Sequence, residues 1–187
     1  MKLTTATVFE LMAQRGIGRY GLSDVSQLEH ALQSAALAAK RQLGDELVIA
    51  ALLHDVGHLL VGDDVDLAAE GVDDFHEETA ARALVSLYGP AVAEPVRLHV
   101  AAKRYLCGTN PAYYGKLAQD SKDSLDLQGG PMSAMEIAEF DALPHRSAAL
   151  ALRIIDDEAK TAGLAVPALE TYRQTAVRLE AAHRTGA

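Results

Sequence analysis

A histidine followed directly by an aspartate, His54-Asp55, lies in the apolar run that begins at Ala50. Burying an imidazole and a carboxylate costs several kcal/mol unless the two groups are paired or bind a metal. For the dipeptide alone, a structural ion pair is the alternative interpretation. Asp55 has two oxygens and can bridge two ions. His58 follows His54 by one helical turn and shares its face, which suits a group that lies beside a metal site or contacts a substrate.

Four further residues of ligand type lie in other segments with helical periodicity. They are His30, His76, His99 and Asp156. Each alone is more often a satisfied core residue or a solvated group than a ligand, and His145 and His183 keep that interpretation. Together with His54-Asp55, the four supply the imidazoles and carboxylates of a two-metal site. Ligation without thiolate favours iron, manganese or zinc and disfavours a structural zinc site.

Most of the sequence has the hydrophobic periodicity of helices, so helices must position these residues. No segment shows a strong strand pattern. Helices are predicted near 4–14, 25–42, 45–58, 75–89, 90–102, 133–140, 145–162 and 167–184. Ser26 and Glu29 are placed for a capping box. The segment 103–132, rich in glycine and proline, is predicted to be an irregular binding loop or lid. No linker divides the chain, so we expect one all-α domain over residues 1–187.

Composition limits the partners that the protein can have. The 187 residues carry a net charge of −9, which argues against nonspecific binding to nucleic acid or to an anionic membrane. An anionic small molecule can still bind where local cations outweigh that charge. Cys107 is the only cysteine, so no internal disulfide is expected. With no apolar run of membrane-spanning length and no signal-peptide core, the expected location is cytoplasmic.

The pattern of His30, His54-Asp55 and Asp156 resembles that of the HD-domain superfamily, whose fold is a helical bundle. His76 and His99 match the extra histidines of its dinuclear members. A closer resemblance, over nearly the whole chain, is to the organophosphonate oxygenases, which are mixed-valent di-iron enzymes. It is carried by the stretches Gln27–Gln33, Ala51–His58, His99-Val100, Lys103–Cys107, Tyr113-Tyr114, Gln128–Gly130 with Met132-Ser133, and Asp156-Asp157.

This resemblance implies a role for each matching residue. One iron would be held by His30, His54, Asp55 and Asp156, and the other by Asp55, His76 and His99. The phosphonate contacts would be His58, Lys103, Ser121 and Arg153, with Gln128 as a further candidate. Lysine and arginine are the donors that a phosphonate dianion requires. Tyr20 matches a tyrosine that occupies an iron site in the resting enzyme and leaves when substrate binds. Asp55, His58 and Lys103 are the expected catalytic residues.

Ser23 departs from the family pattern. In the aminophosphonate enzyme an acidic residue at this position contacts the substrate amine, and here Asp24 is the next residue. Either the loop is shifted by one residue, or the substrate lacks a primary amine. A quaternary ammonium fits the second case, because aromatic faces and diffuse negative charge recognise it.

The resemblance implies that an Fe(II)/Fe(III) pair and O2 cleave the carbon–phosphorus bond of a 2-amino- or 2-(trimethylammonio)-1-hydroxyethylphosphonate. The products would be phosphate and glycine or glycine betaine. The alternative is a metal-dependent phosphohydrolase acting on a nucleotide or phosphate monoester, which would not need O2. A non-enzymatic metal sensor is a third possibility, against which the intact ligand set and the basic donors argue. The oligomeric state is left open.

Overall fold

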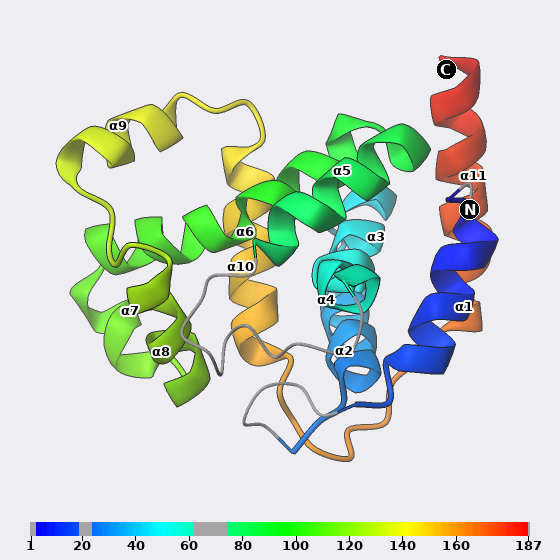
Figure 1. The fold of residues 1–187 in the computed structure, drawn as a ribbon, viewed down its shortest axis with the longest axis horizontal. Coiled ribbons are helices and arrows are strands. Elements are labelled where there is room, and N and C mark those ends of the chain that lie inside the picture. Colours follow the sequence, from blue (N-terminus) through cyan, green and yellow to red (C-terminus); the bar gives the residue numbers. More distant parts are fainter. Residues whose placement is uncertain (1–2, 19–23, 62–74, 187) are drawn as a thin grey trace.

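Residues 3–18, 24–61 and 75–186 are described by the computed structural model, and within these ranges the chain forms helices and no β-strand (Figure 1). The helices are α1 (Thr5–Arg15), α2 (Gln27–Lys40), α3 (Asp45–Leu53), α4 (Val56–Val61), α5 (His76–Tyr88), α6 (Pro90–Thr109), α7 (Pro111–Lys116), α8 (Gln119–Leu127), α9 (Ala134–Asp141), α10 (Arg146–Glu158) and α11 (Glu170–Thr185). The predicted all-α class is confirmed. That the whole chain forms one domain stays a prediction.

The helix α3 is the centre of the bundle. Every residue from Leu47 to Leu53 is buried, as expected for a helix that is apolar on all sides. It packs against α2, α6, α10 and α11. Figure 1 shows α1 and α11 together on one side of the bundle and α7, α8 and α9 on the other. None of the described helices is both long enough and apolar enough to cross a bilayer.

Capping fixes where α2 begins. The Ser26 hydroxyl accepts from the backbone N–H of Glu29 at 3.1 Å, and the Glu29 carboxylate accepts from that of Ser26 at 2.7 Å. The predicted capping box is therefore confirmed. It sets the first turn of the helix that carries His30.

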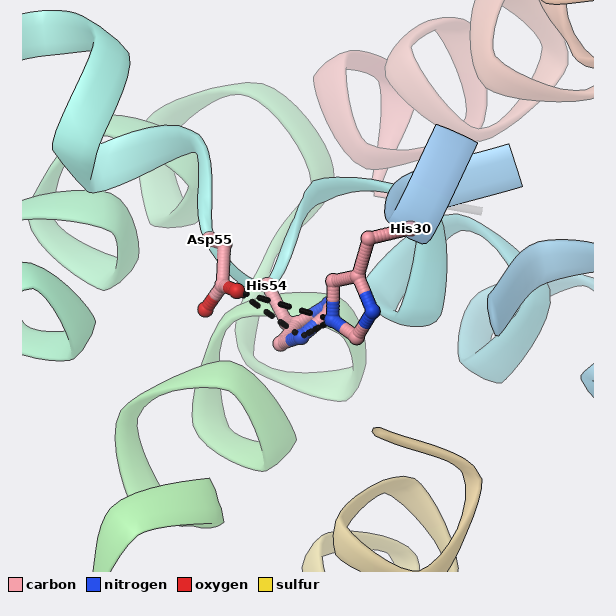
Figure 2. Close-up of side chains that lie close together, drawn as sticks. All are labelled: His30, His54 and Asp55. Carbon is pink, nitrogen blue, oxygen red and sulfur yellow. Dashed lines mark hydrogen bonds and ion pairs between the residues drawn. The ribbon is translucent and has the colours of Figure 1, made fainter. Parts of the chain in front are cut away.

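The prediction of one continuous helix over 45–58 is wrong in one respect. α3 ends at Leu53 and α4 begins at Val56, so His54 and Asp55 form a turn between two helices. On one continuous helix the two side chains would point about 100° apart. In the structure the two side chains meet, with His54 Nε2 3.3 Å from Asp55 Oδ2, as Figure 2 shows.

The prediction of an irregular loop over 103–132 is also wrong. α6 continues to Thr109, and α7 and α8 follow it. Pro111 opens α7, where its missing N–H costs nothing, and the Asn110 side chain caps that helix. A small core formed by Cys107, Leu117 and Leu125 holds these helices against the end of α6. Pro111 therefore marks the start of a helix and does not prevent helix formation in this segment.

Gly57 allows α4 to lie directly against the first turn of α5. A Cβ at this position would be 2.0 Å from the backbone oxygen of His76. No side chain fits that space, and the neighbour is backbone, which cannot swing aside. The close approach therefore fixes His76 relative to the His54-Asp55 turn.

We expect Gly57→Ala to separate α4 from α5 and to lower the free energy of unfolding of the metal-free protein by about 1–3 kcal/mol. Gly115→Ala is the matched control, because nothing lies within 4 Å of its added Cβ, and it should gain about 0.4–1 kcal/mol. Urea unfolding followed by circular dichroism measures both. Equal stability of the two variants would contradict the close packing at Gly57.

Candidate metal centre

Six predicted ligand residues from five parts of the fold meet at one point. The contributing elements are α2, the α3–α4 turn, α5, α6 and α10. The residues are His30, His54, Asp55, His76, His99 and Asp156. All lie in the interior, and the most exposed side chains among them, those of Asp55 and His76, are only 10% and 11% exposed. The sequence placed them in separate helices, and the fold brings all six together.

The first group contains His30, His54 and Asp55, together with Asp156. The two Nε2 atoms of His30 and His54 are 3.1 Å apart, and Asp55 Oδ2 lies 3.6 Å from the first and 3.3 Å from the second. Asp156 Oδ1 lies 3.2 Å from His30 Nε2. Figure 2 shows His30, His54 and Asp55 directed at one another. The ligand atoms of His30, His54 and Asp55 are close enough to one another to hold one metal ion, and Asp156 lies beside them.

The second group shares Asp55 with the first. Asp55 Oδ1 lies 3.5 Å from His76 Nε2 and 3.6 Å from His99 Nε2, and these two nitrogens are 3.3 Å apart. The two oxygens of one carboxylate therefore face different pairs of imidazoles. This is the arrangement that a bridging carboxylate requires.

Backbone carbonyls orient three of the four imidazoles. Each Nδ1 lies within 2.9 Å of a carbonyl oxygen, from Ala159 for His30, Ala51 for His54 and Val96 for His99. A carbonyl only accepts, so Nδ1 carries the hydrogen and the Nε2 lone pair faces the centre. The Nδ1 of His76 instead lies 3.6 Å from a carboxylate oxygen, Oε2 of Glu77. The ring nitrogens are thus prepared for metal ligation.

Two carboxylate oxygens show that the residues fit a metal. Asp55 Oδ2 and Asp156 Oδ1 are buried and have no hydrogen-bond partner among the described atoms. Such atoms are rare and costly in native proteins, and a bound cation would satisfy both. Both oxygens face the first group, so one metal ion bound there would coordinate them.

The titration of the cluster reflects its two carboxylates. Burial alone would lower the pKa of His54, but the charges of Asp55 and Asp156 outweigh it and raise that pKa to about 10. Burial lowers the pKa of His99 to about 3, and the charges of His54 and His76 act in the same direction. The two carboxylates thus favour a positive charge at this point, and a bound cation would supply it.

A cluster of cations adjoins the first group. Lys103 and Arg153 are 2% and 4% exposed, and Arg153 Nη1 lies 2.6 Å from Asp156 Oδ2. Lys103 Nζ donates to Ser124 Oγ at 2.8 Å. Burial, with the charge of Arg153, lowers the pKa of Lys103 to about 8. Two buried cations with a serine hydroxyl beside them are a suitable environment for an anion.

The other predicted contacts lie around these two groups. The His58 ring stacks on His76, with centroids 4.0 Å apart. Ser121 is buried beside the cations, and Gln128 Oε1 is buried without a hydrogen-bond partner. Asp24 is exposed just before α2. Tyr20 and Ser23 lie outside the described residues.

Lys160 was missed by the sequence interpretation. Its Nζ lies 3.4 Å from Ser121 Oγ, and its charge lowers the pKa of both Lys103 and Asp156. A spacing signal existed, because Lys160 follows Asp156 by four residues and α10 ends between them. Ser124, three residues after Ser121 on α8, carries the same kind of signal.

A helical bundle in which a His-Asp turn joins two histidine pairs defines a metal-binding domain of the HD type. The chain belongs to the HD-domain family, whose sequence profile matches residues 28–160.

Two relatives place the chain in a branch of that family. It is 46% identical over 167 residues to hydroxymethylphosphonate dioxygenase of Gimesia maris, covering 89% of this chain and 83% of that protein. It is 37% identical over 170 residues to [1-hydroxy-2-(trimethylamino)ethyl]phosphonate dioxygenase (glycine-betaine-forming) of Leisingera caerulea, covering 89% and 87%. The predicted membership of the HD-domain phosphonate oxygenase branch is confirmed, and the chain is an oxygenase with a metal-binding domain.

We expect Asp55→Ala to lose metal from both groups, because both pairs of histidines face this one carboxylate. Metal per chain after saturation with iron and desalting should fall from about two to near zero. Asp126→Ala, which changes an exposed carboxylate on α8, is the control and should keep the wild-type value. A wild-type content of one metal, or an unchanged content in Asp55→Ala, would contradict the shared carboxylate.

Proposed function

We propose that this protein is a di-iron dioxygenase that cleaves the carbon–phosphorus bond of a 1-hydroxyalkylphosphonate. The observation that supports this most directly is the position of the buried Lys103 and Arg153 cluster, against the outer side of Asp156. A metal centre with cations beside it can hold one molecule by two ends. A hydroxyphosphonate has two such ends, because the phosphonate is a dianion and the hydroxyl is a neutral oxygen donor.

The metal ligands would divide into two sets that share Asp55. His30, His54 and Asp156 would hold one iron, and His76 and His99 the other. When bound, an Fe(II)/Fe(III) pair supplies the one-electron chemistry that reaction with O2 requires. The second set has one carboxylate fewer, which leaves more positions for exogenous ligands.

The cations would bind and orient the phosphonate. Lys103 and Arg153 provide charge-assisted donors, and Ser121 provides a hydroxyl between them and Lys160. We add Lys160 to the contacts expected from the family. Burial of this cluster strengthens each interaction, because little water competes for the anion. The result would be a fixed direction for the carbon that bears the hydroxyl.

His58 would border the reacting carbon. Its ring stacks on His76, so it lies beside the second set of ligands without belonging to it. An imidazole there can accept or return the proton of the substrate hydroxyl. Gln128 would donate or accept a hydrogen bond at the edge of the same site, because its buried side-chain oxygen has no hydrogen-bond partner among the described atoms.

The overall reaction balances without a further reductant. One hydroxyalkylphosphonate and one O2 give one carboxylic acid and one phosphate, with both oxygen atoms of O2 retained in the products. The carbon that bears the hydroxyl is oxidised and loses the electrons that O2 gains. The carbon–phosphorus bond breaks, and carbon and phosphorus each form a bond to oxygen. One O2 should therefore be consumed for each phosphate released.

We expect iron-reconstituted protein to release phosphate from 1-hydroxyphosphonates only when O2 is present, in equal amounts to the O2 consumed. Lys103→Ala should raise the KM about tenfold or more, because it removes a hydrogen bond to a charged group worth roughly 1.5–3 kcal/mol. A phosphate assay with an oxygen electrode measures both quantities.

Lys116→Ala, which changes an exposed lysine on the neighbouring α7, is the matched control and should leave the KM unchanged. Phosphate release that continues under anaerobic conditions from a phosphate monoester would identify a phosphohydrolase instead. Equal KM values for the Lys103 and Lys116 variants would remove Lys103 from the binding site.

The substituent on the hydroxyl-bearing carbon is a separate question. We propose that the trimethylammonium compound is a better substrate than its primary-amine analogue, because Ser23 cannot neutralise a primary ammonium as an acidic residue would. The Gimesia maris relative is named for a substrate with no further carbon. Hydroxymethylphosphonate therefore belongs in the same comparison.

We expect kcat/KM for 1-hydroxy-2-(trimethylammonio)ethylphosphonate to exceed that for the primary amine, and Ser23→Glu to raise the value for the primary amine. Asp24→Asn is the control for a shifted loop. If the wild-type protein prefers the primary amine and Asp24→Asn removes that preference, Asp24 takes the amine contact and the proposed order is wrong. Turnover of hydroxymethylphosphonate alone would exclude both amines.

A further inference from the structure

Arg153 is held by side chains on three sides. Its Nη1 lies 2.6 Å from Asp156 Oδ2, its Nη2 pairs with Asp157 Oδ1, and its Nε donates to the Tyr113 hydroxyl at 3.1 Å. A guanidinium carries five N–H donors in one plane. Three partners in different directions therefore fix both the position and the plane of this group, and they leave further N–H donors unused.

Tyr113 closes a ring of hydrogen bonds with Asp157. Its hydroxyl donates to Asp157 Oδ2 at 2.5 Å while accepting from Arg153. Burial raises the pKa of Tyr113, and the charge of Asp157 adds to this against the opposing charge of Arg153. The hydroxyl thus keeps its proton at neutral pH and can serve as the donor to Asp157.

The direction of these bonds matters for Arg153. Because Tyr113 occupies Oδ2 of Asp157, the guanidinium meets only Oδ1 of that carboxylate. Without the hydroxyl, Asp157 could pair with Arg153 through both oxygens, which is the geometry that arginine and carboxylate prefer. Such a pair would turn the guanidinium toward Asp157 and use donors that are otherwise available.

Tyr113 also connects two parts of the fold. It belongs to α7, whereas Arg153 and Asp157 belong to α10, the helix that carries Asp156. Its ring packs against the small core of Cys107, Leu117 and Leu125. Replacing tyrosine by phenylalanine would keep this packing and remove only the hydroxyl.

We infer that Tyr113 and Asp157 are positioning residues that hold Arg153 in the orientation in which its remaining N–H groups bind the phosphonate. The inference rests on the proposed function, since it assigns the anion to Arg153. The Tyr113 hydroxyl, on α7, would thus help to set the affinity for that anion.

Tyr113→Phe tests this inference, with Tyr114→Phe as the matched control because the adjacent tyrosine is 45% exposed. The probe is methylphosphonate, titrated calorimetrically into iron-loaded protein without O2. We expect the Kd to rise about tenfold in Tyr113→Phe and to stay unchanged in Tyr114→Phe. Iron content and Tm should match the wild type in both variants, and turnover should show a raised KM with a similar kcat.

Several outcomes would overturn the inference. An unchanged Kd in Tyr113→Phe would do so, and so would a loss of iron or a loss confined to kcat, since either indicates a purely structural role. If Tyr113→Phe does not fold, Asp157→Asn opens the same ring and must weaken methylphosphonate binding by a similar factor. Wild-type protein that binds no methylphosphonate and releases no phosphate would refute the proposed function itself. Wild-type binding that both variants retain would refute only the role of Tyr113 and Asp157.

Discussion

The carboxylate of Asp55, enclosed between two pairs of imidazoles, is the constraint on which the rest of the structure depends. Its Oδ2 faces His30 and His54, and its Oδ1 faces His76 and His99. A buried carboxylate with an unsatisfied oxygen is unfavourable unless cations lie beside it. Each ligand-bearing helix must therefore reach one small volume. That requirement explains why α3 is central and buried from Leu47 to Leu53, and why α4 lies so close to α5 at Gly57.

Asp156 connects the metal centre to the cation cluster. Its Oδ1 faces His30, and its Oδ2 meets Arg153. The same carboxylate thus orients toward a metal on one side and holds a guanidinium on the other. In a chain with a net charge of −9, this local grouping of Lys103, Arg153 and Lys160 is how an anion can be accepted. On the proposed function, metal occupancy and anion affinity would be linked electrostatically through this one residue.

The relatives agree with this division of the site into two ends. Their names share a hydroxyl-bearing phosphonate and differ in what is attached to it. The residues that we assign to the phosphonate lie on α6, α8 and α10 and just beyond α10, all of which the structure describes. Tyr20 and Ser23, which we associate with the variable end, lie outside the described residues.

The sequence by itself determined the helical class, the six candidate ligand residues and the capping box at Ser26, because periodicity, ligand chemistry and capping are local properties. It did not determine the break after Leu53, since nothing local distinguishes His54 and Asp55 from a continued helix. It also missed α7 and α8, which are held by a small core around Leu125 that forms only when the end of α6 is present. The roles that we propose for Lys160 and Tyr113 also depend on tertiary structure. Each acts on a residue distant in sequence, and only tertiary packing brings such partners within hydrogen-bonding distance.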